Sequence, residues 1–114
     1  MYAYISGTVD QVLSDRAIIE AAGVGYELLC SGMTLKQLAP GKPARLYAHL
    51  HLAEGVMALY GFFDTAEREM FRRLIGITRV GPKVALSVLS VLTPPDVAAA
   101  VVTQNAAAFE RVPG

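Results

Sequence analysis

The chain has 114 residues, of which 54% are hydrophobic, and its ten basic and ten acidic residues give no net charge. This length fits one or two small domains with a real core, and the neutrality argues against a protein coated in basic residues, although a local nucleic-acid footprint stays compatible with it. No apolar run is long enough to cross a bilayer, the N-terminus lacks the features of a signal peptide, and the single Cys30 predicts a buried, inert thiol in a reducing cytoplasm.

The first half of the chain is predicted to form β-structure. Its segments rich in β-branched and aromatic residues are separated by turn signals, so strands are expected at 2–13, 17–21, 26–30, 44–52 and 56–62. Gly7 is expected to mark a bend or bulge in the first strand, and Ser31 to cap a short helical turn that ends before Pro40. Five strands with a short helix between the third and fourth predict a Greek-key barrel of the OB type.

Two patterns within the barrel segment resemble functional motifs, but we favour a structural interpretation of each. Gly23 and Gly25 lack the third glycine and the following helix of a dinucleotide-binding motif, which indicates a hairpin turn. His49 and His51 share one face of a regular strand. Without a third ligand nearby they are a weak metal signal, and we expect a structural or surface role for them.

The second half of the chain changes to helical periodicity. Asp64 followed by Glu67 resembles a capping box, so a helix is expected to begin after Phe63. Its apolar face is Met70, Phe71, Leu74 and Ile75. A second helix is expected from Pro82 to about Val91, which makes this region all-α.

The turn between these two helices predicts an anion site. Gly81 permits a positive φ or a close backbone approach, and Pro82 suits a first helical position. The free N–H groups of the helix N-terminus and Lys83 then favour a phosphate. Basic residues are also concentrated here, because Glu69 is the only acid between the first and last of Arg68, Arg72, Arg73, Arg79 and Lys83. A solvated helix face would look similar, but the coincidence with the turn favours a functional interpretation of these basic residues.

The C-terminal residues predict more helix and the start of another turn. Thr93 to Asp96 indicates a helix start, with that helix expected to run to Val102, and Asn105 is expected to cap a short helix. The chain stops at Val112–Gly114, where a second turn of the same kind would begin. We therefore expect a truncated sequence.

Four segments in this order resemble the RuvA family, whose members bind Holliday junctions for bacterial branch migration. They are Gly23-Val24-Gly25-Tyr26-Glu27, Leu59-Tyr60-Gly61-Phe62, Val80-Gly81-Pro82-Lys83 with Ala85-Leu86, and Val112-Pro113-Gly114. The resemblance covers essentially the whole chain. It implies an OB-type barrel over residues 1–63, serving assembly and the junction core, and a helix–hairpin–helix DNA-binding domain over 64–114 with an incomplete second hairpin.

The resemblance also implies the function and the partners. The expected protein is non-catalytic and cytoplasmic, needs no cofactor and does not contact a membrane. It would assemble as a homotetramer, or as two tetramers face to face, around a four-way DNA junction in recombinational repair. The motor would be a separate ATPase of the RuvB type, contacted through a domain that this chain lacks, and a RuvC-type resolvase would act on the same junction.

The site residues implied by the resemblance lie in two hairpins and one loop. The first hairpin falls on Arg79, Val80, Gly81, Pro82 and Lys83, which would hold phosphates without reading bases. The second falls on Pro113 and Gly114, after Val112. This chain has Arg79 where the family usually has glycine, and the change either adds charge or strains the turn.

The loop implied to carry the family's acidic pin is Ala53-Glu54-Gly55. Fourfold symmetry would gather four copies of Glu54 at the crossover of the junction, where carboxylates repel phosphates. The family typically has a second acid where this chain has Gly55 and a basic residue where it has Ala53. The pin of this chain is therefore expected to be weaker.

Two alternatives from other functional classes stay open. A base-excision glycosylase with the same hairpin would need a carboxylate beyond it, and Asp96 is the acid at a suitable distance. A single-strand binder would use aromatic and basic residues of the barrel. The barrel has few cations, and its tyrosines are expected in the core or at subunit contacts: Tyr2, Tyr4, Tyr26, Tyr47 and Tyr60.

Overall fold

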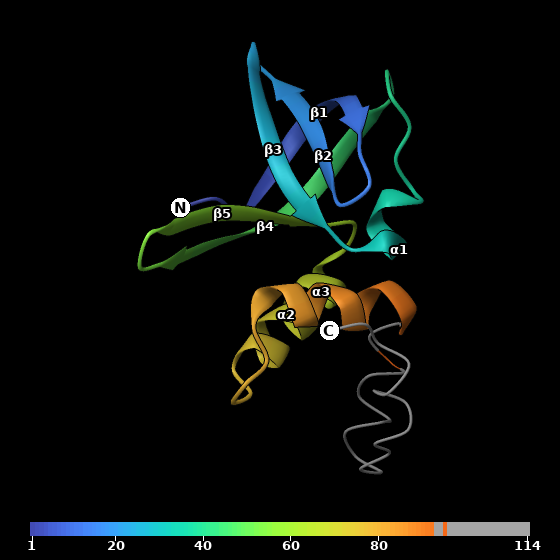
Figure 1. Ribbon diagram of the computed structural model, residues 1–114. Helices are drawn as coiled ribbons and strands as arrows, with labels where there is room; N and C mark the ends of the chain where they lie inside the picture. Colours follow the sequence, from blue (N-terminus) through green and yellow to red (C-terminus); the bar gives the residue numbers. More distant parts are fainter. Residues whose placement is uncertain (93–94, 96–114) are drawn as a thin grey trace.

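The computed structural model describes residues 1–92 and 95, which form a closed five-stranded barrel and two longer helices below it (Figure 1). The elements in chain order are β1 (Tyr4–Val12), β2 (Arg16–Ala21), β3 (Val24–Cys30), α1 (Gly32–Leu35), β4 (Pro43–Ala53), β5 (Val56–Phe62), α2 (Thr65–Ile75) and α3 (Pro82–Val91). Every predicted strand and helix within these residues is present. The strand ends differ from the prediction by at most two residues, whereas α1 ends earlier than expected, at Leu35.

The strand order around the barrel is that of an OB fold. The order is β1-β2-β3-β5-β4, closed by pairing of β1 with β4, and only the β3–β5 pair is parallel. The short helix α1 lies between β3 and β4 in the chain, as predicted. Alternate residues of β1 to β4 point inward and, together with Leu35 of α1, form a core of Ile5, Val9, Ala17, Ile19, Leu28, Cys30, Leu46 and Ala48. The predicted fold class is confirmed.

The expected bulge in β1 lies at a different residue. The register with β2 shifts between Val9 and Gln11, so the extra residue is Asp10 rather than Gly7. Gly7 has another role: a Cβ atom built on it would lie 2.1 Å from the backbone oxygen of Glu20. Gly7 is therefore needed because two strands approach closely there.

Two tight turns explain why glycine occupies positions 23 and 55. Ala22 and Gly23 both have positive φ, 53° and 83°, which is the pattern of a type I′ hairpin turn between β2 and β3. At the β4–β5 hairpin only two residues, Glu54 and Gly55, separate the paired Ala53 and Val56. Gly55 has a φ of 72°, a conformation in which most L-residues are strained.

The N-terminus of α2 is capped as predicted, but only one half of the expected capping box forms. The Asp64 side chain accepts a hydrogen bond from the backbone N–H of Glu67 at 2.8 Å. The Glu67 carboxylate does not return to Asp64. It accepts hydrogen bonds from the hydroxyls of Ser31, at 2.9 Å, and Thr34, both fully buried. Ser31 also caps α1, as predicted, so this cluster joins α1 to the first turn of α2.

Helices α2 and α3 share a core with the barrel. Phe71 and Leu74 of α2 and Val88 and Leu89 of α3 pack with Phe62 at the end of β5. The remaining buried members of this cluster are Tyr60, Ala85 and Leu92. The predicted apolar face of α2 is thus directed at the barrel and at α3, and the helix pair is held against one end of the barrel (Figure 1).

Several predictions lie outside the described residues. These are the helices expected after Thr93 and after Asn105, Asp96 as a possible catalytic acid, and Val112, Pro113 and Gly114 as the start of a second hairpin. Within the residues that are described, none of the helices has the length and apolar character to cross a membrane.

Candidate nucleic-acid interface

The turn between α2 and α3 is built around Arg79. The N–H of Val80 donates to the oxygen of Ile77 at 3.0 Å, which closes a four-residue β-turn with Arg79 in its third position. Arg79 has a φ of 73°. That is the conformation of a type II turn, whose third position normally holds glycine because it lies in the left-handed region. The arginine in this turn therefore both adds a charge and strains the backbone.

Gly81 does not have the positive φ that we considered for it. Its φ is −86° and its ψ is 173°, which any residue adopts. A Cβ atom built on Gly81 would meet nothing within 4 Å. Neither backbone strain nor crowding within the described chain requires glycine here.

The N-terminus of α3 is open to solvent and uncapped. Gly81 is the N-cap residue and makes no side-chain hydrogen bond to the helix, and Pro82 occupies the first turn as predicted. The first N–H groups of a helix have no carbonyl partner within it, so those of Lys83 and Val84 stay available. Together with the helix dipole and the exposed Lys83, they form an anion-binding surface.

The five predicted residues of this hairpin lie together but present different groups. The side chains of Arg79 and Lys83 are exposed, as is Gly81. Val80 and Pro82 are half-buried, and Val80 packs against the core shared with the barrel. They contribute backbone geometry, while the two cations contribute charge. Lys83 also lines a cavity of about 390 Å³ between α3 and the barrel.

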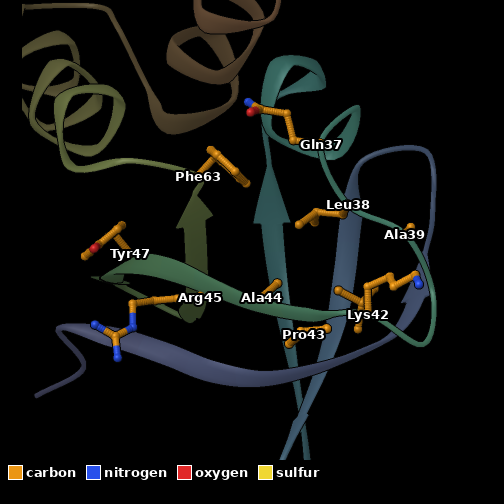
Figure 2. A pocket seen from close by; sticks show the side chains of 10 residues that line it. Gln37, Leu38, Ala39, Lys42, Pro43, Ala44, Arg45, Tyr47 and Phe63 are labelled. Carbon is orange, nitrogen blue, oxygen red and sulfur yellow. The ribbon is translucent and has the colours of Figure 1, made fainter.

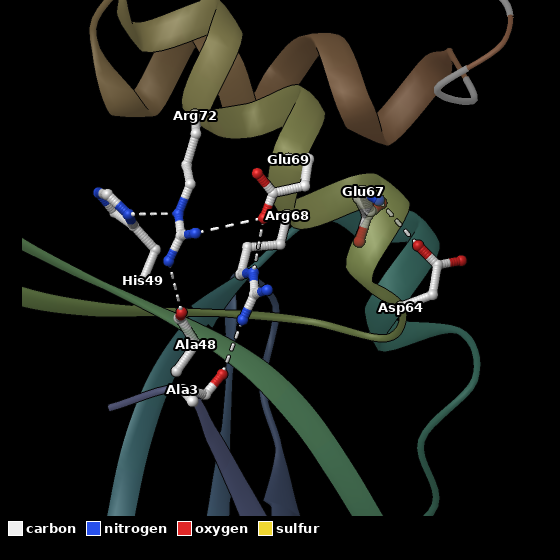
Figure 3. A network of polar contacts seen from close by, with 8 residues as sticks. All are labelled: Ala3, Ala48, His49, Asp64, Glu67, Arg68, Glu69 and Arg72. Atoms are coloured by element: carbon white, nitrogen blue, oxygen red, sulfur yellow. Dashed lines mark hydrogen bonds and ion pairs between the residues drawn. The ribbon is translucent and has the colours of Figure 1, made fainter. Parts of the chain in front are cut away.

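The basic residues around the hairpin do not all have the same surroundings. Two of the arginines, Arg68 and Arg72, contact the barrel (Figure 3). Arg68 donates to the oxygen of Ala3 at 2.9 Å, and Arg72 donates to the oxygen of Ala48 at 3.5 Å. Both also form ion pairs with Glu69 at 3.2 Å. These arginines fasten α2 to the barrel. The functional interpretation of the basic excess therefore stays a prediction, and the structure adds an attachment role for Arg68 and Arg72.

The paired histidines take part in the same attachment. His49 accepts a hydrogen bond at Nδ1 from Nε of Arg72 at 3.2 Å, and its ring contacts Phe71 edge-on. Burial, Arg72 and His51 lower the pKa of His49, in that order, which favours the neutral imidazole that accepts this hydrogen bond. This is the structural role that we expected. Among residues 1–92, no three His, Cys, Asp or Glu side chains are grouped closely enough to hold a metal ion.

Glu54 lies at the exposed tip of the β4–β5 hairpin, which projects beyond the barrel (Figure 1). In that view the α2–α3 turn extends to the same side of the molecule. The positive φ of Gly55 gives a physical reason for the missing second acid, since glycine fits this position better than aspartate or glutamate does.

Large apolar side chains beside Glu54 were missed in our sequence reasoning. Leu52, Val56 and Met57 are 62%, 50% and 77% exposed. Leu52 and Met57 are opposite one another across the two strands, so they share one face. The available signal was the apolar residues on both sides of the predicted loop Ala53-Glu54-Gly55, because a hairpin tip beyond a barrel has no core to bury them.

Cys30 is buried as predicted and is 4% exposed. Its Sγ donates to the oxygen of Leu28 at 3.3 Å. Burial, with a smaller effect from Glu67, raises the pKa of the Cys30 thiol to about 12. The thiol therefore remains protonated and is a poor nucleophile at neutral pH.

Comparison with known proteins relates the chain to one family. The RuvA N terminal domain family matches residues 1–61. The chain is similar to the Holliday junction branch migration complex subunit RuvA of Alkaliphilus oremlandii (35% identical), Nocardia farcinica (43%) and Methylobacterium nodulans (44%). Each match covers 100% of this chain but only 59%, 57% and 56% of the respective relative. The chain thus spans less than three-fifths of the length of these curated relatives.

Proposed function

This chain belongs to the RuvA family, and from that membership we propose that it is a non-catalytic subunit that binds Holliday junctions. Binding depends on the structure of the junction and not on its base sequence, and it holds the four arms open and flat for branch migration. The relatives named above are subunits of a branch migration complex. The proposed setting is the bacterial cytoplasm and recombinational DNA repair.

The observation that carries this proposal is the open N-terminus of α3 beside two exposed cations. The N–H groups of Lys83 and Val84 and the side chains of Arg79 and Lys83 can all bind a phosphate, and none of these groups reads a base edge. A single hairpin neutralises few phosphates. Several subunits around one junction would multiply this modest contact into tight binding.

The exposed Glu54 supports a role for the barrel at the centre of the junction. In a homotetramer, four hairpin tips would approach the symmetry axis, and their carboxylates would repel the phosphates of the crossing strands. Residues 1–63 would then provide assembly and the central pin, and residues 64–114 would hold the arms. Two tetramers could enclose the junction from both sides.

The remaining partners follow from the same proposal. A RuvB-type motor ATPase would drive migration, and a RuvC-type resolvase would cut the junction. The chain itself would bind DNA without chemistry and without a cofactor. It would therefore contribute geometry and charge, and the partners would supply hydrolysis.

Gly81→Asp tests the hairpin. The open space and extended φ at residue 81 accept the new side chain, and aspartate is a good N-cap. We therefore expect the melting temperature to stay equal or rise. Junction affinity at low salt should fall about tenfold or more, because the carboxylate faces the phosphate. Band-shift titration of a synthetic four-way junction measures the affinity.

Gly81→Asn is the matched control, since it provides a similar N-cap without the charge. It should lose much less affinity than Gly81→Asp. A linear duplex of equal length should bind more weakly than the junction to the unmodified chain, and changing its sequence should have little effect. Equal binding of junction and duplex would overturn the proposed function, and unchanged binding by Gly81→Asp would exclude this hairpin as the phosphate contact.

A further inference from the structure

The outer face of the β1–β4 pair carries two neighbouring aromatic rings with a cation at each end of the pair. The guanidinium carbon of Arg45 lies 4.1 Å from the centre of the Tyr4 ring. Tyr4 in turn meets Tyr47 edge-on at 6.3 Å, and the guanidinium of Arg68 lies 5.6 Å from the Tyr47 ring. The row Arg45–Tyr4–Tyr47–Arg68 therefore runs across two strands and reaches α2. We refer to it as the stacked row.

Strand alternation places these side chains outside the barrel. Leu46 and Ala48 of β4 point into the core, so Arg45 and Tyr47 must point outward. Tyr4 is directly opposite Tyr47 in the antiparallel register. Tyr4 is 47% exposed and Arg45 is exposed, so the row is a surface feature. Of the two places where we had expected the tyrosines, the core and subunit contacts, the first does not apply to Tyr4.

The charge of this face is positive and largely unsatisfied by protein groups. Among residues 1–92, Arg45 and Lys42 form no ion pair and no side-chain hydrogen bond, and Glu69 is the only carboxylate paired with Arg68. A guanidinium over an aromatic ring keeps its charge and its N–H donors. The face therefore offers donors for phosphates directly beside rings that can stack.

A cavity of about 390 Å³ continues this face past Arg45 (Figure 2). Lys42, Arg45 and Tyr47 line one side of it, and Leu38 and Phe63 line another. Phe63 is 41% exposed although it is a large aromatic residue. A hollow with apolar walls and cations at its rim suits a flat aromatic ring joined to an anion, as in an unstacked nucleotide.

We propose that the stacked row and this cavity bind a segment of single-stranded DNA. Its phosphates would contact Arg45 and Lys42, and its bases would stack on Tyr4 and occupy the hollow beside Phe63. Unpaired bases have free faces for stacking, whereas the bases of a duplex do not. A second copy of this chain is a poorer fit, because the exposed aliphatic residues gather elsewhere, at the β4–β5 hairpin. This site is separate from the α2–α3 hairpin and goes beyond junction binding.

Fluorescence anisotropy with a labelled oligothymidylate of about 16 nucleotides tests this site. We expect the unmodified chain to bind it, and Tyr4→Ser and Arg45→Gln each to weaken binding roughly tenfold, since loss of one stacked ring or one phosphate contact has this size. Tyr4→Phe keeps the ring and should bind like the unmodified chain. Lys36→Gln removes an exposed cation outside the row and the cavity and should also have little effect.

Junction binding by the same variants distinguishes the two proposals. Tyr4→Ser and Arg45→Gln should keep at least most of the junction affinity, and Gly81→Asp should keep oligothymidylate binding. The single-strand site is overturned if Tyr4→Ser and Arg45→Gln bind oligothymidylate as the unmodified chain does. It is equally overturned if light scattering shows that both variants lose self-association, which would identify the face as a subunit contact.

Discussion

At the scale of single residues, the most informative position is Arg79. An L-residue in the left-handed region costs about 1–2 kcal/mol, and the structure holds an arginine there in a turn that glycine fits better. Strain of this kind persists only where the surrounding structure enforces it, and it concentrates at functional sites. In this chain the strained residue carries one of the exposed cations of the proposed interface.

Arg79→Gly should therefore raise stability and lower DNA affinity. Relief of the strain, reduced by the greater backbone freedom of glycine in the unfolded chain, should increase the free energy of unfolding by about 0.5–1 kcal/mol. Loss of one phosphate contact should reduce the slope of log affinity against log salt by about 0.9. Urea denaturation and salt-dependent anisotropy with a four-way junction measure the two effects.

Arg79→Lys is the control for this pair of effects. It keeps both the charge and the strained conformation, so stability and salt slope should resemble those of the unmodified chain. If Arg79→Gly gained stability with an unchanged salt slope, Arg79 would be a strained residue without a part in DNA binding.

Glu67 shows how one residue joins several elements. Its buried carboxylate accepts from Ser31 and Thr34, and Thr34 accepts from the N–H of Phe63 at 3.1 Å. Burial raises the pKa of Glu67 above its ordinary 4.5, against the opposing effect of the two hydroxyls. The folded chain thus binds this proton more tightly than the unfolded chain does.

The contribution of Glu67 to stability should therefore depend on pH in a defined direction. It is fully present below pH 4.5 and is lost as the pH rises through the raised folded-state pKa. Because Glu67→Gln does not titrate, the unfolding free energy of the unmodified chain minus that of the variant should decrease from pH 4 toward neutrality.

Urea denaturation at a series of pH values measures this difference, with Glu20→Gln as the control, since Glu20 is an exposed glutamate on β2 away from this cluster. A difference that rises with pH, or does not change, would contradict the raised pKa of Glu67.

At the scale of elements, the sequence predicted the features that depend on interactions between residues close together in the chain. The strand and helix ends follow from turn residues and caps such as Ser31 and Asp64, whose partners lie three residues away. The bulge at Asp10 was placed wrongly at Gly7, because glycine marks a close approach as often as a bulge. Likewise, positive φ was considered for Gly81, since no sequence rule places an arginine in the left-handed region.

Contacts between elements that are distant in the chain could not be predicted from the sequence. Glu67 bonds Ser31 across 36 residues, and Arg68 bonds Ala3 across 65. Their direction depends on how α2 docks on the barrel, which periodicity does not specify. For the same reason the sequence identified the Arg79–Lys83 hairpin but not the stacked row, whose members meet only when β1 pairs with β4.

At the scale of the whole molecule, the β4–β5 hairpin bears on assembly. Contiguous exposed apolar residues on a small protein mark an interaction surface, and Leu52, Val56 and Met57 are such a group around Glu54. A hairpin that projects beyond the barrel can reach a neighbouring subunit. We expect these residues to be buried in the proposed homotetramer.

Met57→Glu should therefore shift the chain from tetramer toward monomer, because it places a charge in an apolar contact. Size-exclusion chromatography with light scattering measures the mass, with and without a four-way junction. Val24→Glu is the control, since Val24 is 48% exposed on the β2–β3 hairpin instead. An equal effect of both substitutions, or none, would remove the β4–β5 hairpin from the subunit contact.

The core shared by Tyr60, Phe62 and the two helices has a consequence for biosynthesis. Because β5 supplies part of the apolar surroundings of Phe71 and Leu89, α2 and α3 lack a complete core until the barrel is formed. The barrel segment leaves the ribosome first, so the helices can pack against the folded barrel when they emerge. The helix pair is therefore poorly suited to exchange by recombination between genes as an independent module, and it should be inherited together with its barrel.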